Sequence, residues 1–374
     1  MKITAVKPFL MRAVERNWLF VKVETDEGLH GWGEATLELK ERTVAQAVTD
    51  MEPFILGEDP TRIEHLWQTL YRQGFWRGGV VLNSALSGVD QALWDLTGKA
   101  YGVPVYRLLG GPVRDRIRLY THGGVKAVPG IREAGFTGIK CGPGVDTSST
   151  RDQAVAARFR AHVQAMREAG GPEMDLMIDN HGASRPAQAI RMLAAVEDQD
   201  LLFFEEPCPP DNPDVLEPLA RGGFRTALAT GERLFTRWGF RTLLERQLVS
   251  VIQPDLCHAG GISEVRRIAA MAETYYVQVA PHNPYGPVST AACLHLCAAI
   301  PNFLILEYVW TNEPWRSRVQ LGEPLAARSG YLELPTAPGL GIDLDEEVIA
   351  SRPFEALDVS MYRRFDRDGA VADA

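Results

Sequence analysis

Six short apolar runs in the second half of the chain each end in an acidic residue or a histidine, 23 to 27 residues apart. One strand, one loop and one helix take about that many residues, so the pattern predicts repeated β/α units of a parallel barrel. The strand C-termini of such a barrel converge on one face, where catalytic side chains gather. The residues that could do chemistry on that face are Asp179, Glu205, Glu232, Asp255, His282 and Glu307.

Three carboxylates end consecutive predicted strands, at Asp179, Glu205 and Glu232. At the mouth of one barrel they would repel one another and raise each other's pKa unless a cation lay among them. Ligation by carboxylate oxygens, with no Cys or His in the set, favours a hard ion such as Mg²⁺. Each acid could instead cap a helix or pair with an arginine. Three of them at regular spacing favour a magnesium site.

Two histidines are candidates for proton transfer. Asp255 and His282 end neighbouring strands, so Asp255 could accept a hydrogen bond from one ring nitrogen and make the other more basic. This arrangement predicts a general base; the alternative is a buried structural histidine. His181 lies two residues after Asp179 and shares its face of the extended strand end. It could protonate a leaving group, or it could simply belong to a loop.

Other polar and aromatic residues could bind substrate. Lys140 and Glu307 end the second and eighth predicted strands and could contact a substrate carboxylate. Arg16, Trp18 and Trp76 lie in loops of the N-terminal region and could cover the tail of a substrate as lids. Each of these five residues could instead serve in packing or in a structural contact.

The first hundred residues have a different pattern from the rest. NWLFVKVETDEGLHGWGEA alternates apolar and polar residues around a DEG turn, which predicts antiparallel strands. Helical patterns follow near 41–56, 60–73 and 83–100, and LLGGPVRDR is a linker rich in Gly and Pro. This region is predicted to form an α+β unit.

From the linker onward, strand and helix patterns alternate. Eight candidate strands lie near 117–122, 137–141, 175–179, 201–205, 226–231, 250–254, 277–281 and 303–308. The segment 310–345 is rich in Pro and Gly and shows no clear eighth helix. The predicted fold is a modified TIM barrel of the form (β/α)7β with an α+β capping domain. We expect the cap in 1–113, the catalytic barrel in 114–320, and a C-terminal segment, 321–374, that returns to the cap.

Composition and charge narrow the class of protein. The 374 residues are 45% hydrophobic and 23% charged, as in ordinary globular proteins. A net charge of −9 argues against a nucleic-acid partner, and the apolar runs are shorter than the roughly 20 residues of a membrane span. Five cysteines without paired spacing favour reduced thiols and a cytoplasmic location. No nucleotide-binding glycine motif is present.

The ordered motifs resemble the enolase superfamily, specifically its mandelate-racemase-like branch. They are QALWDLTGKAYGVPVYRLLGG, LFFEEP, ATGER, IQPDLCHAGGISE, APHNPYGPVSTAACLH and TAPGLGID, together with the N-terminal strand pair. Within that branch the chain is most similar to acid-sugar dehydratases, which act on aldonates such as D-galactonate or on aldarates. The resemblance implies the capped barrel, Mg²⁺ on the three carboxylates, a His282–Asp255 base and a symmetric homo-oligomer.

The resemblance also implies a mechanism. His282 would take the proton next to a sugar-acid carboxylate, and His181, in the family pattern Asp-x-His-Gly, would protonate the departing C3 hydroxyl. An ene-diolate and then a 2-keto-3-deoxy acid would result. Racemases of the branch carry Lys-x-Lys on the second strand, whereas this chain has Lys140-Cys141-Gly142, which favours elimination. An epimerase or racemase, and a catalytically silent metabolite-binding barrel, remain the alternatives.

Overall fold

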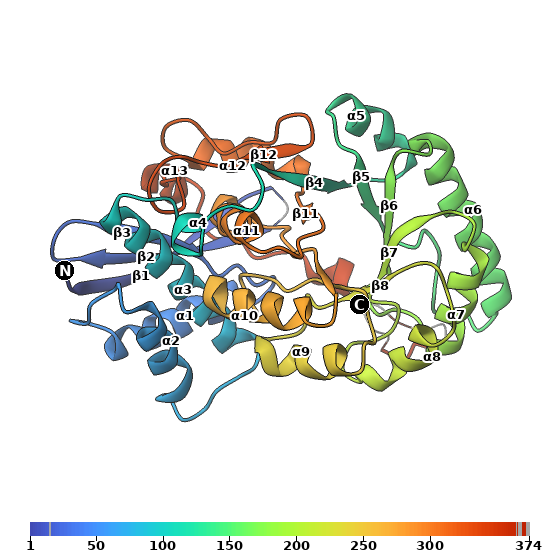
Figure 1. Ribbon diagram of the computed structural model, residues 1–374, viewed down its shortest axis with the longest axis horizontal. Coiled ribbons are helices and arrows are strands. Elements are labelled where there is room, and N and C mark those ends of the chain that lie inside the picture. The colour runs from blue at the N-terminus through green and yellow to red at the C-terminus, as the bar shows by residue number, and fades with distance from the viewer. Residues whose placement is uncertain (15, 364, 366–368, 372–374) are drawn as a thin grey trace.

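The computed structural model describes residues 1–374 except 15, 364, 366–368 and 372–374. A small antiparallel sheet with its helices forms a cap, and a curled parallel sheet with outer helices forms the second part (Figure 1). This architecture confirms the predicted capped barrel. Within the described part of the chain, no helix is long and apolar enough to cross a membrane.

The cap is built around the sheet order β1-β2-β3. Gly28 has φ +80° in the turn between β2 and β3, which is the predicted DEG turn. β3 packs so closely on α3 that a Cβ on Gly33 would come within 1.8 Å of Gly88 O, so glycine is required at this position. The cap elements are β1 (Ile3–Arg12), β2 (Asn17–Thr25), β3 (His30–Glu34), α1 (Glu41–Met51), η1 (Glu52–Phe54), α2 (Ile63–Arg72), α3 (Val80–Tyr101) and α4 (Val105–Leu108).

The second part carries eight parallel strands in the order β10-β9-β8-β7-β6-β5-β4-β11. A parallel bridge between Val279 and Phe303 joins the seventh strand to the start of the eighth, which closes the barrel. The strands are β4 (Arg116–His122), β5 (Gly138–Cys141), β6 (Asp175–Asp179), β7 (Leu201–Glu205), β8 (Leu228–Thr230), β9 (Val251–Ile252), β10 (Gln278–Val279) and β11 (Leu306–Glu307).

Seven α-helices alternate with the eight parallel strands, as the form (β/α)7β requires. They are α5 (Val128–Glu133), α6 (Asp152–Gly170), α7 (Pro186–Ala195), α8 (Glu217–Ala220), α9 (Thr236–Glu245), α10 (Gly261–Glu273) and α11 (Pro287–Ala299), with the short turns η2 (Val125–Ala127) and η3 (Pro213–Leu216). The barrel interior is packed with one buried side chain from most strands: Tyr120, Met177, Phe203, Ala229, Val251, Ala280 and Ile305. This plug of apolar side chains forms the floor of the barrel mouth, below the polar strand ends.

The chain after β11 forms no long eighth helix among the described residues, in agreement with the predicted (β/α)7β form. It forms η4 (Trp310–Asn312) and the short helix α12 (Glu313–Val319), and then β12 (Tyr331–Glu333) pairs antiparallel with β4. A helix of seven residues is too short to show a periodic pattern in the sequence.

Within the predicted segment 321–374, β12 lies on the barrel, and α13 (Glu346–Ala350) lies against the cap strand β1. Asp343 Oδ1 accepts a hydrogen bond from Trp32 Nε1 at 2.6 Å, which ties this segment to the cap. A last turn, η5 (Val359–Tyr362), follows. Residues 364, 366–368 and 372–374 of the segment lie outside the described residues.

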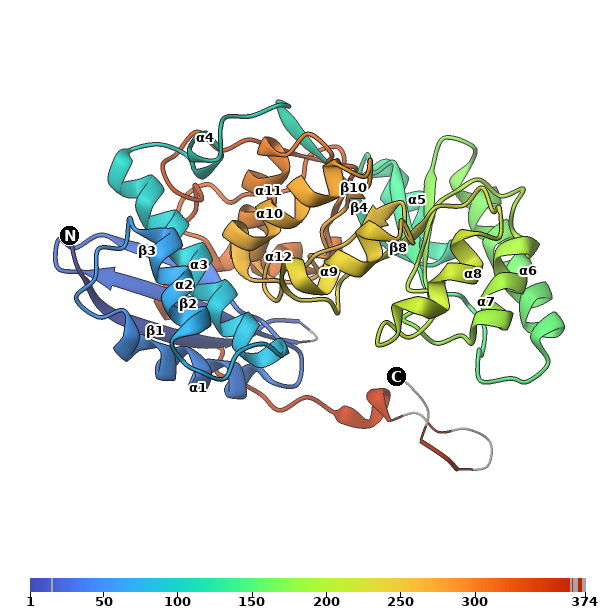
Figure 2. The same cartoon turned by 60° about the horizontal axis from the view of Figure 1, so that its bottom comes forward.

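Buried polar contacts join the cap to the barrel. The Glu34 carboxylate, at the end of β3, accepts hydrogen bonds from the backbone nitrogens of Gly286 and Ser289 at 2.8 and 2.9 Å. These donors lie at the N-terminus of α11, which has no earlier turn to satisfy them. Trp67 Nε1 donates to Gly260 O at 2.9 Å, and α3 packs against α10, so the cap helices lie beside the barrel helices (Figure 2).

Asp95 on α3 should be a main determinant of cap stability. Its buried carboxylate accepts hydrogen bonds from Trp32 N, Leu340 N and Lys99 Nζ at 2.8, 2.7 and 2.7 Å. Asp95→Ala leaves two backbone donors and an ammonium without a partner, so we expect the free energy of unfolding in urea to fall by about 3 kcal/mol. Asp50→Ala, an exposed change on α1, should stay within about 0.5 kcal/mol of the parent. Equal values for the two variants would contradict this role.

Candidate active site

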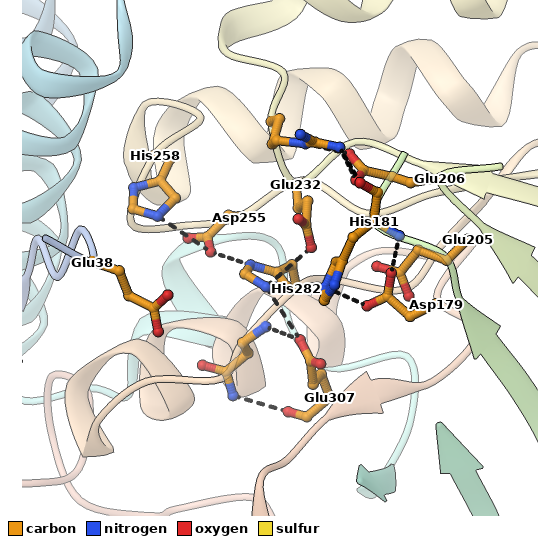
Figure 3. Close-up of polar contacts among 12 residues, drawn as sticks. Glu38, Asp179, His181, Glu205, Glu206, Glu232, Asp255, His258, His282 and Glu307 are labelled. Carbon is orange, nitrogen blue, oxygen red and sulfur yellow. Dashed lines mark hydrogen bonds and ion pairs between the residues drawn. The ribbon is translucent and has the colours of Figure 1, made fainter. Parts of the chain in front are cut away.

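A cleft of about 660 Å³ lies at the C-terminal ends of the barrel strands, facing the cap. The cap contributes Arg16 and Glu38 to its lining. The barrel contributes strand-end residues from around the ring, among them His122, Lys140, Asp179, Glu232, His282 and Glu307. Figure 3 shows how the acids and histidines from separate strands point into one shared space. The predicted convergence of the strand ends is therefore present.

The Lys140 ammonium lies at the centre of the acidic cluster. Its Nζ is 3.1 Å from Asp179 Oδ2, 2.9 Å from Glu205 Oε2 and 3.0 Å from Glu307 Oε1, and all four side chains are buried. Burial alone would lower the pKa of Lys140, but the carboxylates outweigh it and raise that pKa well above its usual value. The ammonium form of Lys140 is therefore favoured, and it neutralises part of the cluster.

The cluster still carries more negative charge than Lys140 balances. Burial and the nearby Asp179 raise the pKa of Glu205 to about 8. Glu205 Oε1 is buried, and among the described residues it has no hydrogen-bond partner. Ligand atoms of Asp179, His181 and Glu232 lie within 4.8 Å of one another. In a purely structural ion-pair cluster, this buried oxygen would have a hydrogen-bond partner. A carboxylate oxygen without one, next to other carboxylates, fits a binding site for a divalent cation better.

His282 and Asp255 form the predicted pair. His282 Nδ1 lies 2.6 Å from Asp255 Oδ2, and its Nε2 faces Glu232 Oε2 at 3.3 Å. Burial disfavours the imidazolium, but Glu232, Glu307 and Asp255 outweigh burial and raise the pKa of His282 to about 10. A cation bound by Glu232 would remove much of that effect, because the carboxylate would then be neutralised. The ring could then act as a base.

The His181 side chain turns back onto the acidic cluster. The residue has φ +47°, in the left-handed region that few residues other than glycine adopt. Its Nε2 lies 3.0 Å from Asp179 Oδ2, and its backbone nitrogen donates to Asp179 Oδ1 at 3.1 Å. The hydrogen bond to Asp179 is the main reason that the pKa of His181 rises to about 9. A protonated, half-exposed ring is suited to donate a proton into the cleft.

The structure adds residues that the sequence analysis did not single out. His122 ends β4 and hydrogen-bonds through Nε2 to Glu307 Oε1, and Asn283 N donates to Glu307 Oε2 at 2.7 Å. Lys140, His282 and His122 together outweigh burial and hold the pKa of Glu307 well below its usual value. His122 ends its apolar run, RIRLYTH, as the other site residues end theirs, so the same pattern could have found it.

An arginine supports the His181 loop. Arg233 donates to both carboxylate oxygens of Glu206, at 3.0 and 2.5 Å, and to the backbone oxygen of His181 at 3.1 Å. Glu206 and Arg233 each follow a predicted metal ligand by one residue, in LFFEEP and ATGER. Sequence position could have marked them as neighbours of the ligands, although not as partners of each other.

The three predicted lid residues have different positions. Arg16 lines the cleft, and its Nη1 lies 2.6 Å from Glu38 Oε1. Trp18 is fully buried with Phe20 in the core, because its side chain projects from β2 toward that core, so the expectation that it covers substrate is corrected. Trp76 is 80% exposed and lies outside the described cleft lining, beside an apolar hollow near α2.

Comparison with known proteins gives the family. Residues 4–110 match the N-terminal domain of the mandelate racemase/muconate lactonizing enzyme family, and residues 125–348 match the enolase C-terminal domain-like family. The chain therefore belongs to the mandelate racemase/muconate lactonizing enzyme family of the enolase superfamily.

Individual relatives extend over the full length of the chain. It is 40% identical to the D-galactonate dehydratases of Ralstonia pickettii (strain 12J) and Verminephrobacter eiseniae (strain EF01-2), with 100% of each chain covered. It is also similar to the crystal structure of an enolase from Agrobacterium radiobacter bound to Na and L-malate, with a TM-score of 0.92, 35% identity and 100% coverage of both chains. These relatives confirm the prediction that the chain is an enzyme of the hydro-lyase class.

The balance of charge around Lys140 can be tested by Lys140→Met. In protein treated with EDTA, the buried carboxylates would lose their counter-charge, and we expect the free energy of unfolding at pH 7 to fall by about 3 kcal/mol. The deficit should shrink toward pH 5, because protonation of carboxylates with raised pKa values relieves their repulsion. Urea denaturation at several pH values measures both effects. Lys126→Met, at an exposed position, is the control, and a deficit that does not vary with pH would argue against this electrostatic role.

Proposed function

We propose that this protein is a Mg²⁺-dependent dehydratase of a sugar acid, which converts an aldonate or aldarate into a 2-keto-3-deoxy acid. The observation that carries the proposal is the placing of two different proton-transfer groups, the His282–Asp255 pair and His181, around one acidic cluster. The full-length similarity to D-galactonate dehydratases supports the sugar-acid class. The L-malate in the related enolase structure, itself a 2-hydroxy acid, is in keeping with it.

Asp179, Glu205 and Glu232 would hold the metal ion. The unpartnered Glu205 Oε1 and the convergence of Asp179 with Glu232 are the features that fit this role. When bound, Mg²⁺ would supply positive charge beside the substrate carboxylate and so favour the loss of the neighbouring proton. Lys140, already a cation within the cluster, would add to that positive field.

His282 acts as the base in this proposal. Its Nδ1–H donates to Asp255, which fixes the ring and leaves Nε2, on the cleft side, to take the C2 proton of the substrate. The electron pair left by that proton moves onto the substrate carboxylate and gives an ene-diolate.

His181 acts as the acid. Its Nε2–H is held by Asp179 at the cleft and would be transferred to the C3 hydroxyl, which leaves as water while the C2–C3 double bond forms. The resulting enol then tautomerises to the 2-keto-3-deoxy acid. Gly142 stands where racemases of the family carry a second lysine, so among the described cleft residues the other wall lacks that base.

The proposal is tested by incubating the protein and Mg²⁺ with a panel of aldonic and aldaric acids, with detection of 2-keto-3-deoxy product. An epimerase would instead give a product of unchanged mass, with deuterium from solvent at C2. A folded, metal-loaded protein without turnover on any acid would point to a silent barrel. Its assembly into a homo-oligomer and its cytoplasmic location remain predictions.

Replacing the two histidines should separate the two proton transfers. With the substrate found in the panel, His282→Asn should lower dehydration by at least about 10³-fold and abolish exchange of the C2 proton with deuterium, because the base is lost. His181→Asn should lower dehydration by about as much yet retain exchange, because the first step survives. NMR in D₂O measures both. His65→Asn, an exposed change on α2, is the control, and loss of exchange in His181→Asn would refute its assignment as the acid.

Metal binding should be visible as stabilisation. Adding Mg²⁺ at about 100 times its dissociation constant should stabilise the EDTA-treated protein by about 2.7 kcal/mol. Asp179→Asn and Glu232→Gln should each remove most of that gain, as measured by thermal unfolding with and without Mg²⁺. Glu264→Gln is the matched control: Glu264 is buried and paired with Arg237 away from the cleft, so it should lower stability but retain the Mg²⁺ response.

A further inference from the structure

A chain of three buried polar side chains runs from the cap helix α3 to the cleft. Ser84 Oγ lies 2.8 Å from His258 Nδ1, and His258 Nε2 lies 2.9 Å from Tyr285 Oη. Ser84 belongs to the cap, His258 to the loop between β9 and α10, and Tyr285 to the loop that also carries His282. His258 and Tyr285 line the cleft. His258 also lies close to the catalytic pair (Figure 3).

The contacts of Ser84 fix the direction of the first hydrogen bond. Ser84 Oγ lies 2.7 Å from Val80 O, one turn earlier in α3. A carbonyl oxygen can only accept, and a serine hydroxyl has one proton, so that proton goes to Val80. Ser84 Oγ can then face His258 Nδ1 at hydrogen-bond distance only as an acceptor. With Ser84 donating to Val80, the arrangement that satisfies both contacts has the His258 proton on Nδ1.

The second hydrogen bond follows from the first. Burial lowers the pKa of His258, which keeps the ring neutral and leaves Nε2 as an acceptor. Nε2 is 3.7 Å from Asp255 Oδ2, too far for a hydrogen bond. Burial also raises the pKa of Tyr285 well above its usual value, so the phenol keeps its proton and donates it to His258 Nε2. The phenolic oxygen, with its own proton committed, can only accept from other groups.

The Tyr285 ring is held at several other points. Arg316 donates to its backbone oxygen from Nε and Nη2, at 2.8 and 2.6 Å. The ring meets His282 edge to face, with centroids 5.8 Å apart, and the Arg16 guanidinium lies 5.9 Å from its centroid. With the backbone, the ring and the hydroxyl proton all fixed, the phenolic oxygen has little freedom to change its hydrogen-bonding role.

We propose that Tyr285, oriented by His258 and Ser84, accepts a hydrogen bond from a hydroxyl of the substrate tail and is a specificity-determining residue. The inference rests on the proposed sugar-acid substrate. An oxygen that can only accept binds a free hydroxyl, whereas a carboxylate or keto oxygen at that place would find no donor in Tyr285. A buried site of this kind discriminates against an analogue that lacks the hydroxyl, because the polar groups are then left unpaired. Ser84 and His258 are positioning residues.

The orientation can be tested without any substrate. In ¹⁵N-labelled protein, the ring of His258 should give the NMR signature of a neutral imidazole protonated at Nδ1, assigned by its disappearance in His258→Gln. Ser84→Ala should abolish the slowly exchanging Nδ1 proton, because its acceptor is gone. Ser87→Ala should preserve it: Ser87 is equally buried on the same helix and accepts a hydrogen bond from Gly260 N at 2.9 Å. A ring protonated at Nε2 in the parent protein would overturn the proposal.

The specificity role is tested by kinetics on the acid found active in the panel. Tyr285→Phe should raise KM by about 10-fold or more with kcat nearly unchanged, because the lost hydrogen bond serves binding in both the ground state and the transition state. Ser84→Ala should raise KM by a smaller factor, and adding it to Tyr285→Phe should have no further effect. Ser87→Ala should leave KM unchanged.

The possible results separate the two proposals. An unchanged KM in Tyr285→Phe, with active parent enzyme, would overturn the inference while leaving the dehydratase proposal intact. So would equal effects of Ser84→Ala and Ser87→Ala, which would mark a general effect of α3 on stability. If the parent protein turned over none of the acids, the dehydratase proposal would fail, and the proposed specificity role, which rests on that substrate, would fail with it.

Discussion

Repulsion among carboxylates is the constraint around which the centre of this protein is arranged. The strand ends bring the buried Asp179, Glu205 and Glu307 together with the partly buried Glu232, where water screens their charges poorly. The chain offsets part of that repulsion with Lys140 and part with the ring of His282. A metal ion would complete the balance and release the histidine for proton transfer. The same charges thus underlie the proposed metal site and raise the pKa of His282.

The remaining site contacts hold these charged groups in place. His282 is fixed by Asp255, His181 by Asp179, and the His181 loop by Arg233, each through a contact of 2.6–3.1 Å. Such contacts matter for proton transfer because a base or an acid must reach one atom of the substrate at one distance. The plug of apolar side chains inside the barrel provides the rigid floor from which the strand ends project. The cap completes the cleft and contributes Arg16 and Glu38 to its wall.

Much of this arrangement could be predicted from the sequence, and its limits have physical causes. The regular spacing of strand-terminal acids predicted the barrel and the convergence of Asp179, Glu205 and Glu232, because parallel strands end at one face. Trp18 was expected in a loop over the cleft, but it lies at the start of β2 and its side chain is buried in the core. Lys140 was expected to meet a substrate carboxylate, yet it meets three carboxylates of the chain itself. Contacts between distant segments, such as that of Ser84 with His258, could not be predicted because no local sequence pattern indicates them.

The hydrogen bonds between the Glu34 carboxylate and the start of α11 affect how enzymes of this family could evolve new specificities. Residue 34 ends a cap strand, while its backbone partners, Gly286 and Ser289, lie just after the loop that carries His282. A chimaera that took its cap from one relative and its barrel from another would have to match this carboxylate to that loop, or His282 would shift. The cap and the barrel are separate in sequence, but this contact makes them depend on each other. New specificities should therefore arise more readily by substitutions inside an existing cap than by exchange of whole caps.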